Sequence, residues 1–273
     1  MEKRLLALDV DGTLTNRSNQ VTDATVAALR RAADAGILVA LNTGRDWSEA
    51  RPVLERIPEI RYLMGCTGAY LMDVQTRERL VEHPLKLELA RQAYAAVAEY
   101  DAIISLYMDD DVYSEERYLR EFTRFYPEAL GSVVLAHRSV ESLGAVLAAR
   151  TADVDKYYLV FADPDERREA MERVKRLPVF ATAAAFLDME IMAREANKGG
   201  ILLECAEMLG VDPARTVAVG DSENDVAMLQ TAGIGVAMGN AKPKVQAAAG
   251  LVAPDNEHDG VAWVVEQMLR GAL

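Results

Sequence analysis

Short apolar runs that end in polar loops alternate with helical segments, and this alternation constrains the fold of the chain more than any other feature. Residues 5–8 and 37–41 have the pattern of buried strands, and each run stops at a polar loop that contains glycine. Between them, residues 22–35 carry one apolar helical face that ends at Gly36. This strand–helix–strand order predicts a parallel sheet that is covered by helices on both faces.

The last part of the chain repeats the same pattern. Residues 216–219 and 234–238 are predicted strands, and both are followed at once by glycine and polar residues. Predicted helices span residues 199–209, 226–232 and 261–269. The first and last parts of the chain together therefore predict one Rossmann-like, doubly wound α/β core with a parallel sheet.

The middle of the chain differs, because it has fewer junctions between a strand and a polar loop and contains most of the aromatic residues. It begins with a predicted helix at 87–100 and a strand at 102–108, and it contains a strong helix start at Asp163-Pro164-Asp165-Glu166. The other expected elements are helices at 117–126 and 140–149, and strands at 156–161, 179–185 and 186–191. We predict an inserted α/β domain at residues 84–189, with residues 1–83 and 190–273 forming the core.

Composition excludes several classes of protein. The 273 residues include 30 Lys plus Arg and 43 Asp plus Glu, so the net charge is −13. This charge argues against binding to nucleic acids, which depends on attraction to phosphate backbones. No apolar run reaches the ~18 residues of a membrane span, and the start lacks the apolar core of a signal peptide, so a cytoplasmic protein is expected. Cys66 and Cys205 are too few and too far apart to indicate disulfides or a zinc site.

The loop after the first predicted strand carries the most informative motif. Asp9 and Asp11 are two positions apart at a strand end, and such carboxylates point to the same side because side chains alternate along a strand. One carboxylate can attack phosphorus while the other transfers the proton of the leaving group. Gly12 and Thr13 allow backbone N–H groups to approach an anion. Taken alone, the motif is equally consistent with an ordinary turn rich in aspartate and glycine.

Three further motifs carry polar groups at similar places. Asp221 lies in Gly-Asp-Ser-Glu-Asn-Asp after a predicted strand, where clustered carboxylates suit Mg²⁺ but also commonly cap a helix. Thr43 in Thr-Gly-Arg offers a hydroxyl to a phosphate oxygen, although a plain strand-to-helix turn is an alternative. Lys198 lies at a helix start, where a lysine is more often a solvated surface charge. Because the strands of one parallel sheet bring their carboxyl ends to one edge, we expect the motifs to converge there.

The order of the four motifs along the chain resembles that of the haloacid dehalogenase (HAD) superfamily of phosphotransferases. The size and position of the middle domain, together with Asp259-Gly260 and Gly239-Asn240, are similar to those of its Cof-type phosphatases. The resemblance covers essentially the whole core, whereas the inserted domain is similar only in size, position and element order. It implies a HAD-like core with an inserted α/β cap that selects the substrate.

The resemblance also implies a role for each motif residue. Asp9 would be the nucleophile that becomes an aspartyl phosphate, Asp11 the general acid and then the general base, and Lys198 the catalytic cation that offsets charge on Asp9. The phosphate would be bound by Asp11, Gly12, Thr43, Gly44, Lys198 and Asn224. Mg²⁺ would be bound by Asp9, the backbone carbonyl of Asp11 and Asp221, with Ser222, Asp225 and Arg45 in supporting positions.

The chain departs from the family pattern at two positions. Cys66-Thr67-Gly68-Ala69 stands where members commonly carry Asn-Gly-Ala, so Thr67 offers a hydroxyl in place of an amide. Asn42, directly before Thr43, is more polar than the small residue usual in the family. No substrate contact is therefore assigned to Thr67.

These observations predict a Mg²⁺-dependent phosphatase, a phosphoric monoester hydrolase, that acts through an aspartyl phosphate. The expected substrate is a small phosphorylated metabolite, either a sugar phosphate or a phosphorylated cofactor. A sugar phosphomutase with the same intermediate and a non-catalytic protein that binds a phosphometabolite are the alternatives. The expected partners are the phosphate ester and, in a homodimer, a second copy of the chain, with neither nucleic acid nor membrane.

Overall fold

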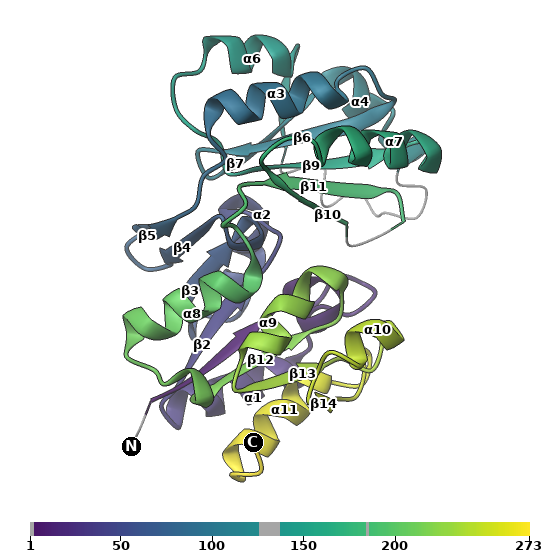
Figure 1. Ribbon diagram of the computed structural model, residues 1–273. Helices are drawn as coiled ribbons and strands as arrows, with labels where there is room; N and C mark the ends of the chain where they lie inside the picture. The colour runs from purple at the N-terminus through teal and green to yellow at the C-terminus, as the bar shows by residue number, and fades with distance from the viewer. Residues whose placement is uncertain (1–2, 126–136, 184–185) are drawn as a thin grey trace. The chain divides into compact units, whose positions relative to one another are not determined.

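The structure is a computed structural model that describes residues 3–125, 137–183 and 186–273. Contacts divide the chain into two compact units (Figure 1). The core unit holds residues 1–44, 50–82 and 197–273, and the inserted unit holds residues 45–49 and 83–196. The predicted boundary placed the return to the core at residue 190, whereas the inserted unit continues to Ala196 and also contains Arg45–Glu49.

The described part of the core unit is built on one sheet in the order β14-β13-β12-β1-β2-β3-β4-β5. Its strands are β1 (Arg4–Leu8), β2 (Ile37–Asn42), β3 (Ile60–Gly65), β4 (Tyr70–Asp73), β5 (Arg79–Glu82), β12 (Thr216–Gly220), β13 (Ile234–Ala237) and β14 (Leu251–Val252). The strands from β14 to β3 run parallel, which confirms the predicted sheet. β4 and β5 extend it as antiparallel strands that the alternation did not predict.

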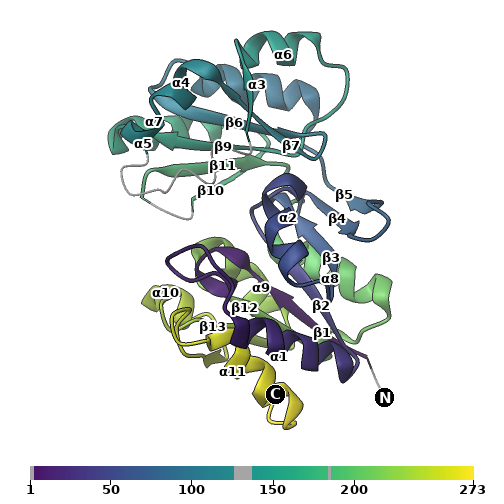
Figure 2. The same cartoon turned by 180° about the vertical axis from the view of Figure 1, so that it is seen from behind.

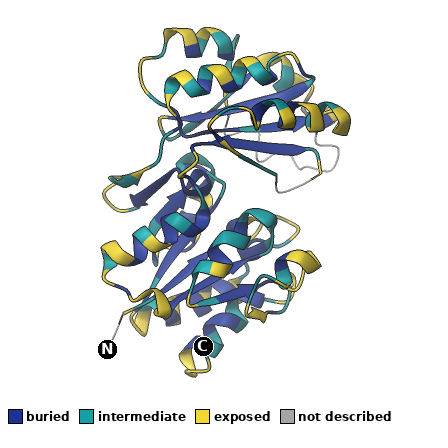
Figure 3. Ribbon diagram, viewed as in Figure 1, coloured by how far each residue is buried: buried dark blue, intermediate teal, exposed yellow. Residues whose placement is uncertain are grey.

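Helices cover both faces of this sheet. α8 (Lys198–Leu209) and α9 (Val226–Thr231) bury Ile201, Cys205 and Met228 in one cluster with Leu5 and Ala7 of β1. α1 (Asp23–Asp34) and α11 (Gly260–Leu269) contact each other on the opposite face (Figure 2). The central strands β1, β2 and β12 are consequently buried on both sides, as their continuous apolar runs predict (Figure 3).

Short elements complete the core unit. The loop after β1 forms a single π-helical turn, η1 (Val10–Leu14), and α10 (Pro243–Gln246) follows β13. Three 3₁₀ turns are η2 (Cys66–Gly68), η4 (Pro213–Arg215) and η5 (Glu223–Asp225). η2 and η5 follow the ends of β3 and β12, and η4 directly precedes β12.

The start of α2 (Trp47–Arg56) corrects one expectation from the sequence. Asp46 and Glu49 form the predicted capping box, because Asp46 Oδ1 accepts from the Glu49 N–H at 2.9 Å and Glu49 Oε2 accepts from the Asp46 N–H at 3.4 Å. The spacing of Asp46 and Glu49 in the sequence predicts this capping box, and an internal proline such as Pro52 predicts a helix that is bent or delayed. The helix is not delayed, since the capping box fixes its first turn and Pro52 is accommodated further along.

The inserted unit has a second sheet, in the order β10-β11-β9-β6-β7-β8. Its strands are β6 (Ala102–Met108), β7 (Asp111–Glu115), β8 (Arg138–Val140), β9 (Lys156–Phe161), β10 (Phe180–Thr182) and β11 (Asp188–Met192). Neighbouring strands are antiparallel except for β7 and β8. α3 (Leu87–Val97), α6 (Leu143–Ala149) and α7 (Pro164–Val174) pack on one face around Leu106, Tyr157 and Ile191.

Several predicted elements of the inserted unit are shorter than expected. The helix predicted at 117–126 is two short helices, α4 (Glu116–Arg120) and α5 (Phe122–Phe125), and its last predicted residue lies outside the described residues. The helix predicted from residue 140 begins at Leu143, because Ser142 caps it by accepting the Ala145 N–H. The strand predicted at 179–185 is β10, and residues 184–185 are also outside the described part. Within the described ranges, every helix is too short or too polar to cross a bilayer.

Candidate active site

The carboxyl ends of adjacent parallel strands meet at one edge of the core sheet. β1 lies between β12 and β2 and runs parallel to both, so the residues that follow these strands emerge together. The Asp9 N–H donates to the Val219 carbonyl at 3.0 Å, which ties the end of β1 directly to β12. The structure therefore brings the loops that carry Asp9, Thr43 and Asp221 to the same edge.

Lys198 is a buried ammonium and not a surface charge. Its Nζ lies 2.6 Å from Asp9 Oδ1 and 2.6 Å from Asp225 Oδ1, and its side chain is fully buried. It is the first residue of α8, which Asn197 caps by accepting the Gly200 N–H at 2.7 Å. The helix cap thus fixes the backbone position of Lys198, and two carboxylates bind its ammonium group.

The pKa values of Lys198 and Asp9 are shifted strongly from their ordinary values. Burial raises the pKa of Asp9 well above its ordinary value, against the opposing effect of Lys198, and Asp225 raises it further. Burial lowers the pKa of Lys198, but Asp225 and Asp9 outweigh this effect and hold that pKa above its usual range. Lys198 therefore stays protonated, whereas an ionised Asp9 needs positive charge beside it.

Asp221 is held against the loop that carries Asp9. Thr13 Oγ1 donates to Asp221 Oδ1 at 3.0 Å. Gly12 has a φ of +77°, and a Cβ at that position would lie 2.4 Å from Asp221 Oδ2, so both the backbone and the space require glycine. Burial, followed by the charge of Asp225, raises the pKa of Asp221 to about 6. A nearby cation would favour the ionised form of this carboxylate and lower its pKa again.

Three carboxylates gather closely enough to hold a metal ion. Ligand atoms of Asp9, Asp221 and Asp225 all lie within 4.8 Å of one another. Both oxygens of Asp225 already accept hydrogen bonds, Oδ1 from Lys198 at 2.6 Å and Oδ2 from the N–H groups of Asp221 and Ser222 at 2.9 Å. Oxygen donors with an excess of negative charge fit a hard cation such as Mg²⁺. Asp9 accepts from Lys198 through Oδ1 and Asp221 accepts from Thr13 through Oδ1, so these two carboxylates are better placed than Asp225 to bind such an ion.

The other predicted site residues lie around this cluster with different degrees of burial. Asp11, two residues after Asp9, is exposed. Asn224 Oδ1 accepts from the Ser222 hydroxyl at 2.7 Å. Thr43 is fully buried, and its N–H donates to the Met64 carbonyl at 2.9 Å, so a phosphate contact would use its hydroxyl.

Two predicted residues follow Thr43 directly in the chain. Gly44 is half-buried and belongs to the core unit. Arg45 groups with the inserted unit, where its guanidinium donates to the Glu49 carbonyl at 3.1 Å. The supporting role predicted for Arg45 therefore stays a prediction.

Two asparagines contribute to the site without having been predicted as site residues. Asn240 Nδ2 donates to the Gly12 carbonyl at 2.8 Å and approaches Asp221 Oδ2 at 3.4 Å. Asn42 Nδ2 donates to the Lys198 carbonyl at 2.8 Å. Asn42 closes β2 and Asn240 lies just beyond β13, so position at a carboxyl end of the parallel sheet was the signal that could have identified them.

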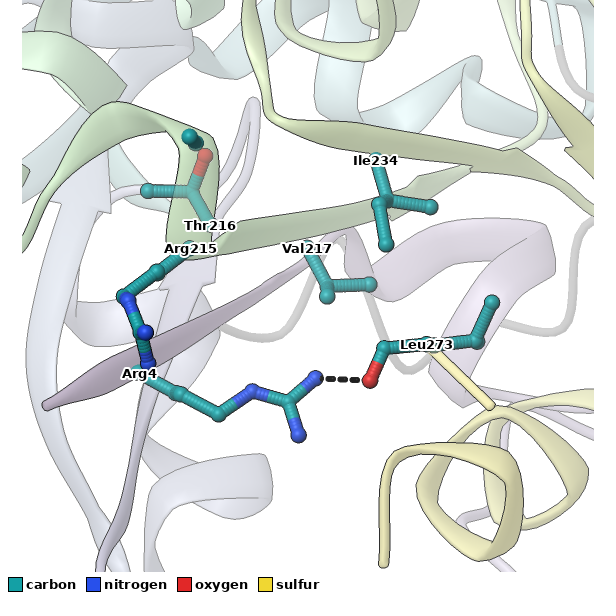
Figure 4. A pocket seen from close by; sticks show the side chains of 7 residues that line it. Arg4, Arg215, Thr216, Val217, Ile234 and Leu273 are labelled. Atoms are coloured by element: carbon teal, nitrogen blue, oxygen red, sulfur yellow. Dashed lines mark hydrogen bonds between the residues drawn. The ribbon is translucent and has the colours of Figure 1, made fainter. Parts of the chain in front are cut away.

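A small depression lies at the other edge of the core sheet. Arg4, Thr216 and Leu273 are among the residues that line it, and the Arg4 guanidinium donates to the Leu273 carbonyl (Figure 4). Arg4 and Thr216 are the first residues of β1 and β12. The depression is therefore at the amino ends of the strands, away from Asp9 and Asp221.

Comparison with known proteins identifies the family. Residues 6–265 match the haloacid dehalogenase-like hydrolase family. A 5-amino-6-(5-phospho-D-ribitylamino)uracil phosphatase of Bacillus subtilis is 26% identical over 98% of this chain and 99% of its own length. A pyridoxal phosphate phosphatase of Escherichia coli is 28% identical over 97% and 98%, respectively. A solved haloacid dehalogenase-like hydrolase of B. subtilis superposes with a TM-score of 0.86 at 25% identity, covering 97% of this chain and 99% of that one.

These matches confirm the predicted family and fold class across nearly the whole chain. They also confirm the prediction of an enzyme, a phosphoric monoester hydrolase of the HAD type. The two phosphatases have different named substrates at similar identity, both of them small phosphorylated metabolites. Relatives at this degree of sequence similarity therefore differ in the individual compound for which they are named.

Proposed function

The chain belongs to the haloacid dehalogenase-like hydrolases, and on that premise we propose that it is a Mg²⁺-dependent phosphatase that forms an aspartyl phosphate on Asp9. The observation that carries the proposal is the Lys198 ammonium, buried 2.6 Å from Asp9 Oδ1 at the carboxyl edge of the parallel sheet. A buried lysine beside a nucleophilic carboxylate can bind the transferring phosphoryl group and offset its charge.

In the proposed reaction, Asp9 attacks the phosphorus of the bound ester. The bond between phosphorus and the leaving-group oxygen breaks, and Asp11 gives that oxygen its proton. Water then attacks the phosphorus of the aspartyl phosphate and gives a proton to Asp11, which releases inorganic phosphate and regenerates Asp9. The exposure of Asp11 supports this role, because the residue must reach both the leaving group and water.

Thr43 and Lys198 would bind phosphate oxygens, with Gly12, Gly44 and Asn224 beside them. Asp9, Asp221 and the backbone carbonyl of Asp11 would hold Mg²⁺, which would supply positive charge to the transferring phosphoryl group. Asp225 would keep Lys198 in place, since one of its oxygens accepts from Lys198 and the other from the turn that carries Asp221.

The proposed substrates are sugar phosphates, sugar-alcohol phosphates and phosphorylated cofactors. The named substrate of one relative carries a phosphorylated ribityl chain, and that of another is pyridoxal phosphate. A screen of free phosphate release from these classes of ester would identify the substrate. Isomerisation of a sugar phosphate without free phosphate would instead indicate a phosphomutase.

The proposal is tested with p-nitrophenyl phosphate as an artificial substrate. Hydrolysis is expected with Mg²⁺, and it should be lost both after chelation and in Asp9→Asn. Asp73→Asn is the matched control, because Asp73 is a buried carboxylate of the same unit that pairs with Arg61 at 2.8 Å. Activity that persists in Asp9→Asn and in the presence of a chelator would contradict the proposal.

A further inference from the structure

Asn42 is a fully buried amide at the end of an otherwise apolar strand. Its Nδ2 donates to the backbone carbonyl of Lys198 at 2.8 Å. Its Oδ1 is also buried, and it accepts no hydrogen bond from any residue that the structure describes. Burying an unpaired polar atom is unfavourable, so packing alone does not account for an amide here. The bond to Lys198 does account for it.

That bond restrains the backbone from which the lysine side chain starts. Lys198 is the first residue of α8, and its side chain extends from there to Asp9. Asn42 directly precedes Thr43 in the chain. The end of β2 therefore carries Thr43 and anchors Lys198, the two residues that the proposed function assigns to phosphate oxygens.

The η2 turn makes a second connection between the same two places. Its Thr67 N–H donates to the Thr43 carbonyl at 2.9 Å. Cys66, Thr67 and Gly68 have φ values of +50°, +58° and +95°, a left-handed conformation that is unfavourable for a β-branched residue. Strain of this kind persists only where surrounding contacts hold it in place.

Gly68 brings this turn against the start of α8. A Cβ on Gly68 would lie 2.5 Å from the backbone oxygen of Asn197 and 2.8 Å from its backbone nitrogen. Asn197 is the residue that caps α8 and directly precedes Lys198. The turn thus contacts the backbone of Asn197 through Gly68, and it binds the Thr43 carbonyl through the Thr67 N–H.

We propose that Asn42 and the Cys66–Gly68 turn form a brace that fixes the position of Lys198 relative to Thr43. Asn42, Thr67 and Gly68 are positioning residues, since they act on catalysis by holding Lys198 in place. This inference rests on the proposed phosphatase function for its catalytic consequence, but the brace itself is a property of the fold.

The principal variant is Asn42→Ala, and its matched control is Thr216→Val. Thr216 is fully buried in the same sheet, and its hydroxyl donates to the Pro213 carbonyl at 2.7 Å and accepts the Gly233 N–H at 3.0 Å. It lies at the amino end of β12, so its loss tests a buried hydrogen bond away from Lys198 (Figure 4).

Steady-state kinetics with p-nitrophenyl phosphate and Mg²⁺ give the first readout. Misplacing Lys198 should lower kcat of Asn42→Ala about tenfold or more. KM should change by less than about threefold, because the interaction lost is stronger in the transition state than in the bound substrate. Thr216→Val should keep kcat within about twofold of the wild type. Equal kcat values in the two variants would overturn the proposal.

A double variant distinguishes positioning from general destabilisation. If Asn42 acts through Lys198, Asn42→Ala should lower kcat no further in a Lys198→Met background. In Gly68→Ala, the added Cβ would clash with the backbone of Asn197. This variant should lower kcat in the wild-type background and have no effect on kcat in the Lys198→Met background. Losses that multiply in the double variants would show that these residues act independently of the lysine and would overturn the proposal.

Backbone hydrogen exchange gives a readout that does not depend on activity. In Asn42→Ala, the first turn of α8 should exchange faster than in the wild type and in Thr216→Val. Unchanged exchange there would overturn the brace whether or not the protein is a phosphatase. A wild-type protein that hydrolyses no phosphate ester would overturn the proposed function alone, and exchange would still decide the inference.

Discussion

Each of the two units buries a lysine beside carboxylates, and the two arrangements differ. In the core unit, Lys198 Nζ lies 2.6 Å from both Asp9 and Asp225. In the inserted unit, Lys156 Nζ lies 3.4 Å from Glu190 Oε1 and 4.7 Å from the centroid of the Tyr107 ring. The first lysine thus binds two carboxylates, whereas the second pairs with Glu190 and lies beside the rings of Tyr107 and Tyr158.

The two lysines also differ in the elements that bring them to their carboxylates. Lys156 and Glu190 lie on adjacent antiparallel strands, two residues apart across the ladder, so their pairing is a local cross-strand contact. Asp9 follows β1 and Lys198 begins α8, so these two residues, 189 positions apart in the chain, meet through the packing of α8 against the core sheet. The contact in the core unit is therefore a long-range tertiary contact, whereas the pair in the inserted unit forms between neighbouring strands.

The largest effect is expected from replacing each lysine with an apolar side chain of similar length. Lys198→Met should lower kcat/KM for p-nitrophenyl phosphate roughly a thousandfold, because it removes the cation beside Asp9. Lys156→Met should keep kcat/KM within about tenfold. Steady-state kinetics of both variants, with circular dichroism to verify folding, would test the comparison. Equal losses would mean that the two lysines do not differ in function.

The raised pKa of Asp46, in the inserted unit, predicts that the stability of the protein depends on pH. Burial, and then the charge of Glu49, raise its pKa from 3.8 to about 7. A raised pKa means that the folded state holds the proton more tightly, so this contribution to stability is present at pH 4 and is lost as pH rises towards 7. At about 1.4 kcal/mol per pKa unit, the loss should be roughly 2–4 kcal/mol.

The variant that tests this is Asp46→Asn, which keeps an oxygen for the Glu49 N–H but cannot ionise. Its free energy of unfolding in urea, relative to the wild type, should rise between pH 4 and pH 8. Asp163→Asn is the matched control, since Asp163 also accepts an N–H at a helix start but is exposed. A difference between Asp46→Asn and the wild type that is the same at both pH values would contradict the assigned pKa.

A smaller effect is expected for metal binding at the core edge. Loss of even an indirect partner of a metal typically weakens binding about 10–100-fold, so Asp221→Asn should raise the Mg²⁺ concentration for half-maximal activity at least about tenfold. Glu190→Gln removes the charge of a buried carboxylate from the inserted unit and should leave that concentration unchanged. Mg²⁺ titrations of activity would measure both, and an equal shift in the two variants would argue against a core metal site.

The smallest effect is expected at Thr67. Asparagine tolerates the left-handed conformation better than threonine, so Thr67→Asn should raise the free energy of unfolding by about 0.5–1 kcal/mol. Thr67→Ala shortens the side chain without that tolerance and should give no gain. Urea unfolding would measure the change, and a less stable Thr67→Asn would show that contacts of the threonine side chain outweigh its backbone strain.

Much of the fold could be predicted because the apolar runs and helix caps act locally. The runs at 5–8, 37–41 and 216–219 became β1, β2 and β12, and Thr22 caps α1 by accepting the Thr25 N–H. β4 and β5 were not predicted because β4 pairs antiparallel with β3, and β5 with β4, without the intervening helix of a strand–helix–strand unit. Helix lengths in the inserted unit were overestimated where a cap such as Ser142 lies inside an apolar stretch.

The sequence by itself determined the order of strands and helices, and with it the edge at which the loops of Asp9, Thr43 and Asp221 meet, because side-chain alternation and parallel pairing follow from local pattern. Only the tertiary structure decided that Lys198 is buried between Asp9 and Asp225 and that Asn42 binds its carbonyl. Those contacts join residues distant in the chain, and their geometry depends on how α8 packs against the sheet. Local pattern carries no information about that packing.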